Sequence, residues 1–313
     1  MLNGAIVLLA LLLQNAANPA QPELTITFAA EKTEVVIGEE IQAEVVLTNV
    51  GDRAADVAEL VFEERSLSFE MTFEAGAGKN KNFFNSVTKP DPHLAERVAP
   101  ARVTLSSKRA LTGLFRIPTL KTGTLTVVAT YKGAGKEVRS SPATLRVAAG
   151  ADGASRLAAT VVTSQGDIQI DLMPDEAPNS VANFVQLVRR GFYGNMNVFR
   201  VIRGQWFQAG CPYENGVGHA GYAVKSEAEG QTATFEPGTV GLSQNLKAGF
   251  TGSQFFIDVI RQTSHDKKFT VIGRVPESRM DVVKKIGGVE TDKATDRPKE
   301  EVRIREIRIV VVK

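Results

Sequence analysis

Alternation of apolar and polar residues over short segments is the feature that most restricts how this chain can fold. Residues 24–28 read Leu-Thr-Ile-Thr-Phe, and residues 41–49 repeat this alternation over a longer stretch. A period of two places successive side chains on opposite faces of a β-strand. Further strand candidates lie at 34–37, 67–73, 101–105, 113–117, 123–131 and 143–147. Turn residues separate them and no helical stripe interrupts them, so we predict an antiparallel β-sandwich over residues 21–148.

A run of small and polar residues divides the chain into two parts. Residues 148–155 read Ala-Ala-Gly-Ala-Asp-Gly-Ala-Ser and have no apolar period, which is typical of a flexible boundary. A chain of 313 residues is also more often two domains than one. We therefore expect a linker at 149–156 and a second domain at 157–313.

The first twenty residues differ from the rest of the chain. Ala5–Leu13 is an unbroken apolar run of nine residues, too short to span a bilayer, which takes roughly 20 residues. Small residues follow at Ala16, Ala17 and Ala20, as in a cleavable signal peptide. We expect a signal peptide at 1–20, export to a bacterial periplasm or exterior, and no stable membrane span. A short uncleaved tail or a strand is the alternative.

Composition argues against several kinds of partner and site. The net charge is +2 and no basic run reaches five residues, so nothing indicates a nucleic-acid partner. One cysteine, Cys211, cannot form an internal disulfide, and three histidines make a dedicated metal site improbable. We expect Cys211 to fill space in a loop, and we expect neither a metal nor another cofactor.

The second half opens with a β-hairpin formed by residues 158–163 and 168–172. An amphipathic helix follows, since Val181, Phe184, Val185 and Val188 stand at positions i, i+3, i+4 and i+7. We expect Asn179 or Ser180 to cap its start and Gly191 to end it. Strand and helix do not continue to alternate, so a doubly wound fold is not indicated. Residues 225–229 (Lys-Ser-Glu-Ala-Glu) are expected to form solvated surface.

Several motifs in this half resemble those of the cyclophilin family of peptidyl-prolyl isomerases, and they occur in the family's order. The matching segments are Ala177–Phe184, Gly191–Tyr193, Phe199–Ile202, Gln208–Gly210, Gly252–Ile257 and Phe269–Val275. The resemblance covers about Leu157 to Lys313. It implies a closed eight-stranded antiparallel barrel with two capping helices, the second at 280–286, and an interior filled by side chains. With the sandwich, the chain is expected to be mainly β.

Rotation about an X–Pro bond needs no nucleophile or metal, because no bond is broken. The barrier of roughly 18–20 kcal/mol comes from C–N resonance. An apolar pocket can hold the proline ring away from water, and a donor aimed at the prolyl nitrogen stabilises the twisted bond selectively. A guanidinium is a cationic donor that stays protonated at working pH.

The resemblance implies roles for individual residues. It makes Arg200 the catalytic arginine and Gln208 the side chain that supports this arginine or the substrate carbonyl. It places Phe256 and Trp206 in the proline pocket. Further substrate-binding candidates, at or near the positions that the family uses, are Phe199, Ser243, Gln244, His265 and Phe269.

Several positions depart from the family pattern, and they put rate and substrate preference in doubt. Gln205 stands where the family has phenylalanine, Trp206 where it has methionine, and Phe269 where it has histidine or tyrosine. Residues 263–268 replace the family's Trp/His-Leu-Asp-Gly, and residues 243–244 stand near its Ala-Asn pair. Since Arg200, Gln208 and Phe256 are all present, an active isomerase is the main hypothesis.

The functional hypotheses differ in what each half does. In the main one, the second half isomerises X–Pro bonds in exported polypeptides while the first half holds a client or envelope partner. Residues 31–52 resemble the opening strands of immunoglobulin-like modules, which is compatible with such a binding role. In the alternative, the second half binds proline-containing segments without turnover. A third hypothesis makes the sandwich the main unit, as an adhesin or scaffold.

Overall fold

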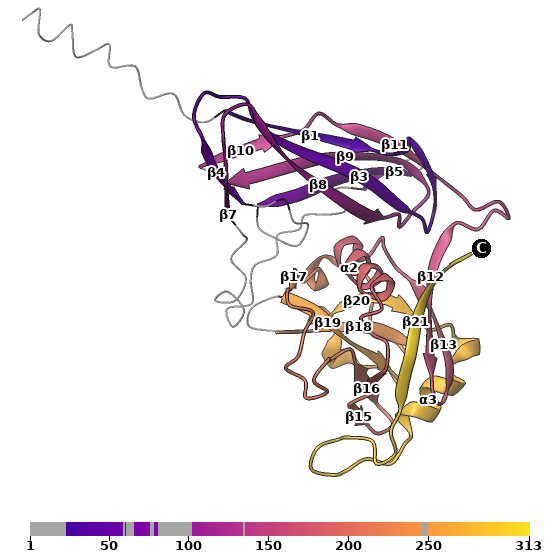
Figure 1. Cartoon of the computed structure of the whole chain (residues 1–313). Helices are drawn as coiled ribbons and strands as arrows, with labels where there is room; N and C mark the ends of the chain where they lie inside the picture. The colour runs from indigo at the N-terminus through magenta and orange to yellow at the C-terminus, as the bar shows by residue number, and fades with distance from the viewer. Residues whose placement is uncertain are drawn as a thin grey trace, which may run out of the picture.

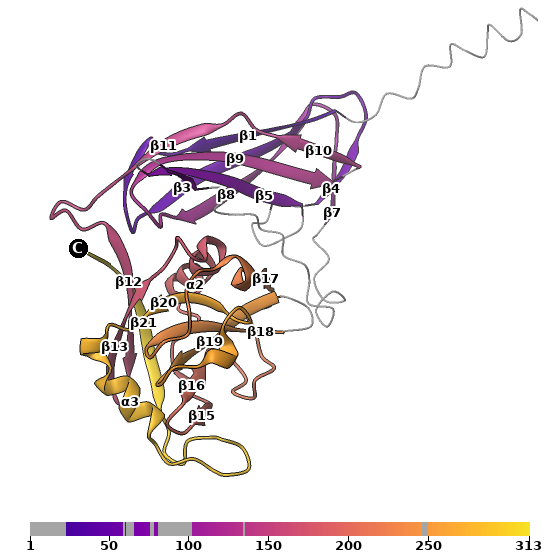
Figure 2. The ribbon, with the colours of Figure 1, turned by 180° about the vertical axis from the view of Figure 1, so that it is seen from behind.

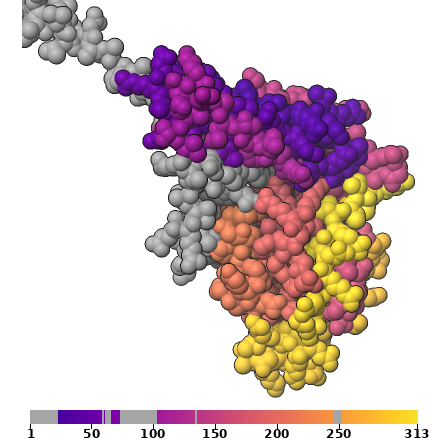
Figure 3. Space-filling model, viewed as in Figure 1, coloured from indigo at the N-terminus to yellow at the C-terminus, as the bar shows by residue number. Residues whose placement is uncertain are grey.

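The protein consists of two mainly β lobes, one stacked on the other (Figures 1 and 3). The computed structural model describes residues 23–58, 60, 66–75, 78–80, 102–133, 135–245 and 250–313. The signal peptide expected at 1–20 lies outside these residues. Within the described part of the chain, no helix has both the length and the apolar character to cross a membrane.

The first lobe contains β1 to β11, arranged mainly in two sheets. One sheet has the order β1 (Leu24–Ala30), β3 (Glu40–Asn49), β8 (Arg109–Pro118). The other has the order β2 (Glu34–Val36), β11 (Ala143–Ala148), β9 (Gly123–Gly133), β5 (Leu67–Ala75), β6 (Gly78–Asn80), with β10 (Lys136–Arg139) also on β9. A separate pair is formed by β4 (Ala55–Ala58) and β7 (Arg102–Leu105).

Aromatic contacts join the inner faces of the two sheets. The ring of Phe69, on β5, lies 5.8 Å from that of Phe28 on β1 and 5.3 Å from that of Phe115 on β8, both edge to face. Rings at these separations are favourable beyond the area that they bury. The alternation read from the sequence therefore does direct one face of each strand into a shared core.

Pairing in the first lobe departs from the expectation in one respect. β2 runs parallel to β11, with Val35 opposite Val147, whereas an all-antiparallel sandwich was expected. The short strands β4, β6 and β10 were not predicted either. Three or four residues give too little alternation for a period to be recognised.

The second lobe contains one large sheet with the order β14-β21-β12-β13-β20-β18-β19-β16-β15, and β17 also pairs with β19. Its strands are β12 (Arg156–Thr163), β13 (Gly166–Leu172), β14 (Met196–Asn197), β15 (Arg200–Ile202), β16 (Trp206–Ala209), β17 (Val224–Lys225), β18 (Thr239–Asn245), β19 (Phe250–Asp258), β20 (Thr270–Arg274) and β21 (Arg303–Val312). Only Val198 and Phe199 separate the two end strands, β14 and β15. The Val198 N–H donates to Val302 O at 2.8 Å and the Phe199 N–H to Gln208 O at 3.1 Å, so one segment bonds to both ends of the sheet.

Helix α2 (Pro178–Arg189) covers the sheet on the side that faces the first lobe, and α3 (Asp281–Gly287) lies beside β13 (Figure 2). The predicted apolar face of α2 is confirmed, since Val181, Phe184 and Val185 are fully buried. Its predicted end is confirmed too. Gly191 has φ +69°, and its N–H bonds to Val188 O at 2.9 Å in a glycine-terminated turn.

The predicted cap of α2 is wrong. Neither Asn179 nor Ser180 caps the helix, which begins at Pro178 without a side-chain cap of its own. The carboxylate of Glu227 instead accepts the backbone N–H of Asn179 at 3.2 Å and of Ser180 at 2.8 Å. Glu227 is therefore half-buried and structural, although residues 225–229 were expected to be solvated surface.

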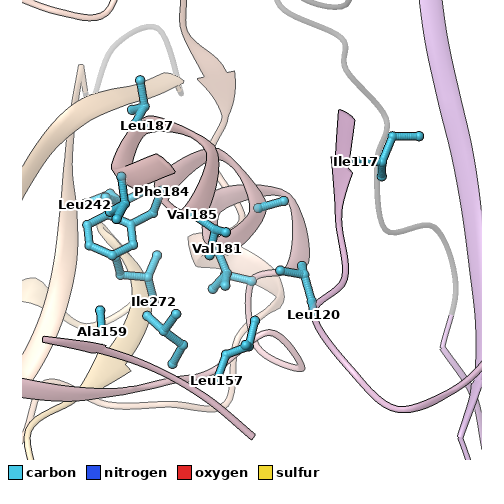
Figure 4. Packing of buried hydrophobic residues seen from close by; sticks show 14 of the residues in the cluster. Ile117, Leu120, Leu157, Ala159, Val181, Phe184, Val185, Leu187, Leu242 and Ile272 are labelled. Carbon is cyan, nitrogen blue, oxygen red and sulfur yellow. The ribbon is translucent and has the colours of Figure 1, made fainter. Parts of the chain in front are cut away.

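The two lobes share a packed boundary. Buried side chains of both belong to one hydrophobic cluster, which includes Ile117 and Leu120 from the first lobe and Leu157 and Val181 from the second (Figure 4). The segment expected to be a flexible linker is hydrogen-bonded, because the Gly150 N–H donates to Ala154 O at 2.8 Å.

Candidate active site

Three of the residues singled out from the sequence lie in one row across the sheet. Arg200 on β15 is directly opposite Gln208 on β16, and Gln208 is directly opposite Phe256 on β19. Gly241 on β18 continues the row. Residues in register project from the same face of a sheet, so the donor, the amide and the aromatic ring share one surface.

A cluster of aromatic rings, called the aromatic pocket below as the candidate binding place for a proline ring, lies at one end of this row. The ring of Phe256 is 5.0 Å from the ring of His265, 5.2 Å from Phe269 and 6.0 Å from Trp206. Phe235 stacks on Phe256 at 5.6 Å with an interplanar angle of 16°. Phe235 and Phe256 are buried, whereas Trp206 and Phe269 are half-buried and reach the surface. The arrangement suits a small apolar ring approached from solvent.

Gly241 provides the space for this stacking. A Cβ atom at this position would lie 2.5 Å from Phe256 Cζ and 2.6 Å from Phe235 Cε1. The two rings therefore lie directly against the backbone of β18, where no other residue fits without displacing them.

A buried acid lies behind the aromatic rings. Asp258 follows Phe256 by two residues on β19, lies opposite Trp206 and is 0 % exposed. Its carboxylate oxygens are 3.3 and 3.4 Å from His265 Nδ1. Burial raises the pKa of Asp258 to about 6, although the bond to His265 acts in the opposite direction. The pocket thus carries a polar pair, Asp258 and His265, behind its apolar surface.

Arg200 is held from two sides. Its Nε and Nη2 atoms donate to Asp296 Oδ2 at 3.2 and 3.1 Å. Its guanidinium carbon lies 5.1 Å from the centroid of the Trp206 ring, within the range of a cation–π contact. The side chain remains 44 % exposed, so a substrate can reach it.

Gln208 makes its contact away from Arg200. Its Nε2 donates to Gln254 Oε1 at 2.7 Å, and Gln254 Nε2 in turn donates to the carbonyl oxygens of Gly216 and Gly218, both at 2.8 Å. These bonds tie the row to the loop that contains Cys211. Cys211 is buried there and accepts the Gly218 N–H at 3.2 Å, as expected of a residue that fills space in a loop.

The remaining predicted residues lie at or beyond the margin of the pocket. Phe199 is buried but is not part of the aromatic pocket, and its ring lies near Gly216. Gln244 donates to the carbonyl oxygen of Lys268, next to Phe269, and Ser243 precedes it on β18. Gln205, which departs from the family pattern, is exposed in the turn before β16.

Five residues of the site were not identified from the sequence: Phe235, Gly241, Gln254, Asp258 and Asp296. Asp258 did carry a signal, since it is the only charge in the apolar run 255–260. Gln254 lies within the matching segment Gly252–Ile257. Phe235 and Asp296 reach the site through loops, and nothing in the sequence indicates these contacts. Among the described residues, no cluster of three or more histidine, cysteine or acidic side chains could hold a metal.

The comparisons with known proteins concern the second lobe. Residues 158–309 match the family model described as cyclophilin type peptidyl-prolyl cis-trans isomerase/CLD. The chain is 36 % identical over 155 residues to peptidyl-prolyl cis-trans isomerase CYP18-2 of Arabidopsis thaliana, covering 48 % of this chain and 92 % of that protein. It is 41 % identical over 108 residues to peptidyl-prolyl cis-trans isomerase B of Bacillus subtilis, covering 34 % of this chain and 75 % of that protein.

These matches show that the chain belongs to the cyclophilin-type peptidyl-prolyl cis-trans isomerase family. The predicted resemblance is thereby confirmed for the second half. Other relatives are larger. The chain is 38 % identical over 154 residues to peptidyl-prolyl cis-trans isomerase cyp15 of Rhizopus delemar, but it spans only 24 % of that protein.

Proposed function

We propose that this protein catalyses cis/trans isomerisation of X–Pro bonds in polypeptides. The observation that carries the proposal is the row formed by Arg200, Gln208 and Phe256, which joins an accessible cationic donor to an aromatic pocket on one sheet surface. No metal or other cofactor enters the proposal, because rotation of the bond requires none.

Each part of the row has a task in this reaction. The proline ring enters between Trp206, Phe256 and Phe269, which removes water from the amide. As the C–N bond twists, the prolyl nitrogen regains its lone pair and accepts a hydrogen bond from Arg200. This bond forms only in the twisted state, so it lowers the barrier without tightening substrate binding. The amide of Gln208 lies beside this position and is oriented by Gln254.

The wider biological role is part of the proposal. We place the protein outside the cytoplasm of a bacterium, where it assists the folding of exported proteins, on the strength of the apolar run Ala5–Leu13. We assign the first lobe an immunoglobulin-like fold that contacts a client or envelope partner. We also regard the second lobe as a closed barrel, because Val198 and Phe199, which join the two end strands, bond to Val302 just before β21 and to Gln208 on β16.

A protease-coupled isomerisation assay on the full chain tests the activity. Wild type should accelerate the cis-to-trans exchange of an Ala-Pro peptide. In Arg200→Ala, the catalysed rate should fall about 10²- to 10³-fold, the usual effect of removing one transition-state donor. Arg203→Ala is the matched control, since this arginine is exposed in the turn three residues later.

The alternative of a proline-segment binder makes a different prediction. Gln205 is exposed where the family has an apolar wall, and this weakens the enclosure of the proline ring. If wild type binds the peptide but does not accelerate its exchange, the isomerase proposal is wrong and the binder hypothesis replaces it.

A further inference from the structure

The loop between α3 and β21 reaches back to the strand that carries Arg200. Within this loop, Asp296 accepts both Arg200 Nε and Nη2 through one carboxylate oxygen, at 3.2 and 3.1 Å. Its backbone carbonyl accepts the N–H of Val201 at 2.8 Å. Two consecutive residues of β15 are therefore bonded to one aspartate, through its side chain and its backbone.

The loop holds Asp296 in place by contacts of its own. Asp296 has φ +57°, a left-handed conformation that aspartate tolerates better than most residues, and its N–H donates to Asp292 O at 2.9 Å. The Asp292 side chain accepts the N–H groups of Ala294 and Thr295 at 3.0 and 2.9 Å. The backbone of Asp296 is thus held by the loop itself, independently of the arginine that its carboxylate binds.

The contact leaves part of the guanidinium available. Of its five N–H donors, Asp296 takes the Nε–H and one on Nη2. Within the described part of the chain, no acceptor is bonded to Nη1. The guanidinium carbon also lies over the indole ring of Trp206, 5.1 Å from the ring centroid. Asp296 therefore holds the Nε edge, Trp206 lies beside the guanidinium, and the Nη1 donors stay free.

The family resemblance implied that Gln208 supports either the arginine or the substrate carbonyl, and in the structure its side chain bonds to a third group. Gln208 Nε2 bonds to Gln254, and no hydrogen bond joins Gln208 to Arg200 among the described residues. An arginine side chain has about 2 kcal/mol of rotamer entropy, so an unanchored guanidinium occupies the productive position only part of the time. A displacement of about 1 Å can cost about 10²-fold in rate.

From this geometry, and resting on the proposed isomerase function, we infer that Asp296 is the positioning residue for Arg200. It fixes the Nε edge of the guanidinium so that the Nη1 donors address the prolyl nitrogen. Asp296 acts on the rate through Arg200 and does not itself touch the substrate.

The test measures catalysis and binding separately in the full chain. Exchange NMR on an Ala-Pro peptide gives kcat, and the fluorescence of Trp206, the only tryptophan of the chain, gives the Kd of the peptide. Asp296→Gly removes the carboxylate without straining the positive φ. It should lower kcat about 10- to 100-fold and change Kd less than about twofold. Asp296→Asn keeps a hydrogen-bond acceptor, so its kcat should lie between those of Asp296→Gly and wild type.

Two controls separate positioning from a loss of structure. Lys299→Ala removes an exposed ion pair with Glu290 in the same loop and should leave kcat unchanged. In an Arg200→Ala background, Asp296→Gly should cause no further loss, because the two residues act as one unit.

Other outcomes overturn the inference. If Asp296→Gly keeps the wild-type kcat while Arg200→Ala loses most of it, the positioning role is rejected and the isomerase proposal stands. The positioning role is also rejected if Asp296→Gly lowers kcat by the same factor in the Arg200→Ala background as in wild type. An inactive wild type rejects the isomerase proposal and this inference with it.

Discussion

At the scale of single residues, the buried carboxyl group of Asp258 is the feature of the site that most opposes folding when it is ionised. The Asp258 side chain has 0 % exposure, so its ionised form lacks the hydration that would stabilise the charge. This loss of hydration raises the pKa of Asp258 from 3.8 to about 6. The folded protein therefore holds this proton more tightly than the unfolded chain. Between pH 4 and 6 the unfolded chain loses the proton first, so this group's contribution to stability falls as the pH rises. It is lowest above about pH 6.

This sign gives a stability prediction. The shift of about 2 units corresponds to roughly 3 kcal/mol across the window. Asp258→Asn cannot ionise, so its free energy of unfolding should fall less than that of wild type between pH 4.5 and 7. Urea titrations followed by Trp206 fluorescence measure the difference.

Asp266→Asn is the matched control for this experiment. The ion pair with Arg261 holds the pKa of Asp266 below its ordinary 3.8, so this group titrates below the same window. Asp266→Asn should therefore keep the wild-type slope between pH 4.5 and 7. If Asp258→Asn also keeps that slope, Asp258 is not the group that titrates.

At the scale of elements, helix α2 owes its start to a residue far along the chain. Its first turn exposes the N–H groups of Asn179 and Ser180, and the Glu227 carboxylate, 48 positions later, accepts both. A carboxylate at a helix N-terminus also interacts favourably with the helix dipole. Burial nevertheless raises the pKa of Glu227, so the contact has a desolvation cost.

Removing this remote cap should weaken the helix. We expect Glu227→Ala to lower the free energy of unfolding by about 1–2 kcal/mol, as for other lost caps. Glu229→Ala, an exposed neighbour, should have no measurable effect. Urea unfolding followed by Trp206 fluorescence compares the two variants. Equal stabilities would show that Glu227 does not support α2.

Local patterns predicted what local patterns can determine. The period of two located β1 and β3, and the spacing of Val181, Phe184 and Val185 gave the buried face of α2, because both follow from backbone geometry. Pairing direction was not predictable, since a parallel and an antiparallel β2 have the same alternation. The motifs located Arg200, Gln208 and Phe256. They could not indicate Asp296, which lies 96 positions from Arg200 and meets it only after folding.

At the scale of the whole molecule, polar contacts reinforce the packed boundary between the lobes. Arg189 at the end of α2 forms an ion pair with Glu40 at 3.2 Å and donates to the carbonyl oxygen of Gly38. A Cβ at Gly38 would lie 2.5 Å from Val311 Cγ2, so the turn between β2 and β3 fits closely against β21. The site strands β15 and β16 lie at the opposite end of the second lobe (Figures 1 and 2).

This boundary should make the lobes unfold together. Arg189 and Glu40 are only 20 % and 24 % exposed. Arg189→Ala therefore removes the nearer partner of a partly buried carboxylate and leaves it the more distant Arg116, at 3.9 Å. We expect a loss of about 1–3 kcal/mol and a calorimetric transition that broadens or divides into two. Arg308→Ala removes an exposed pair with Glu306 and should leave one transition. An unchanged profile for Arg189→Ala would show that this contact does not couple the lobes.

The central claim is that Arg200 lowers the barrier to rotation of an X–Pro bond held in the aromatic pocket. Exchange NMR on an Ala-Pro peptide tests it most directly, because it measures both directions of rotation without a coupling protease. With a catalytic amount of wild type, both rates should rise by the same factor while the cis/trans ratio of the free peptide stays constant. Arg200→Ala should still bind the peptide but no longer accelerate its exchange. Acceleration that persists in Arg200→Ala would contradict the account.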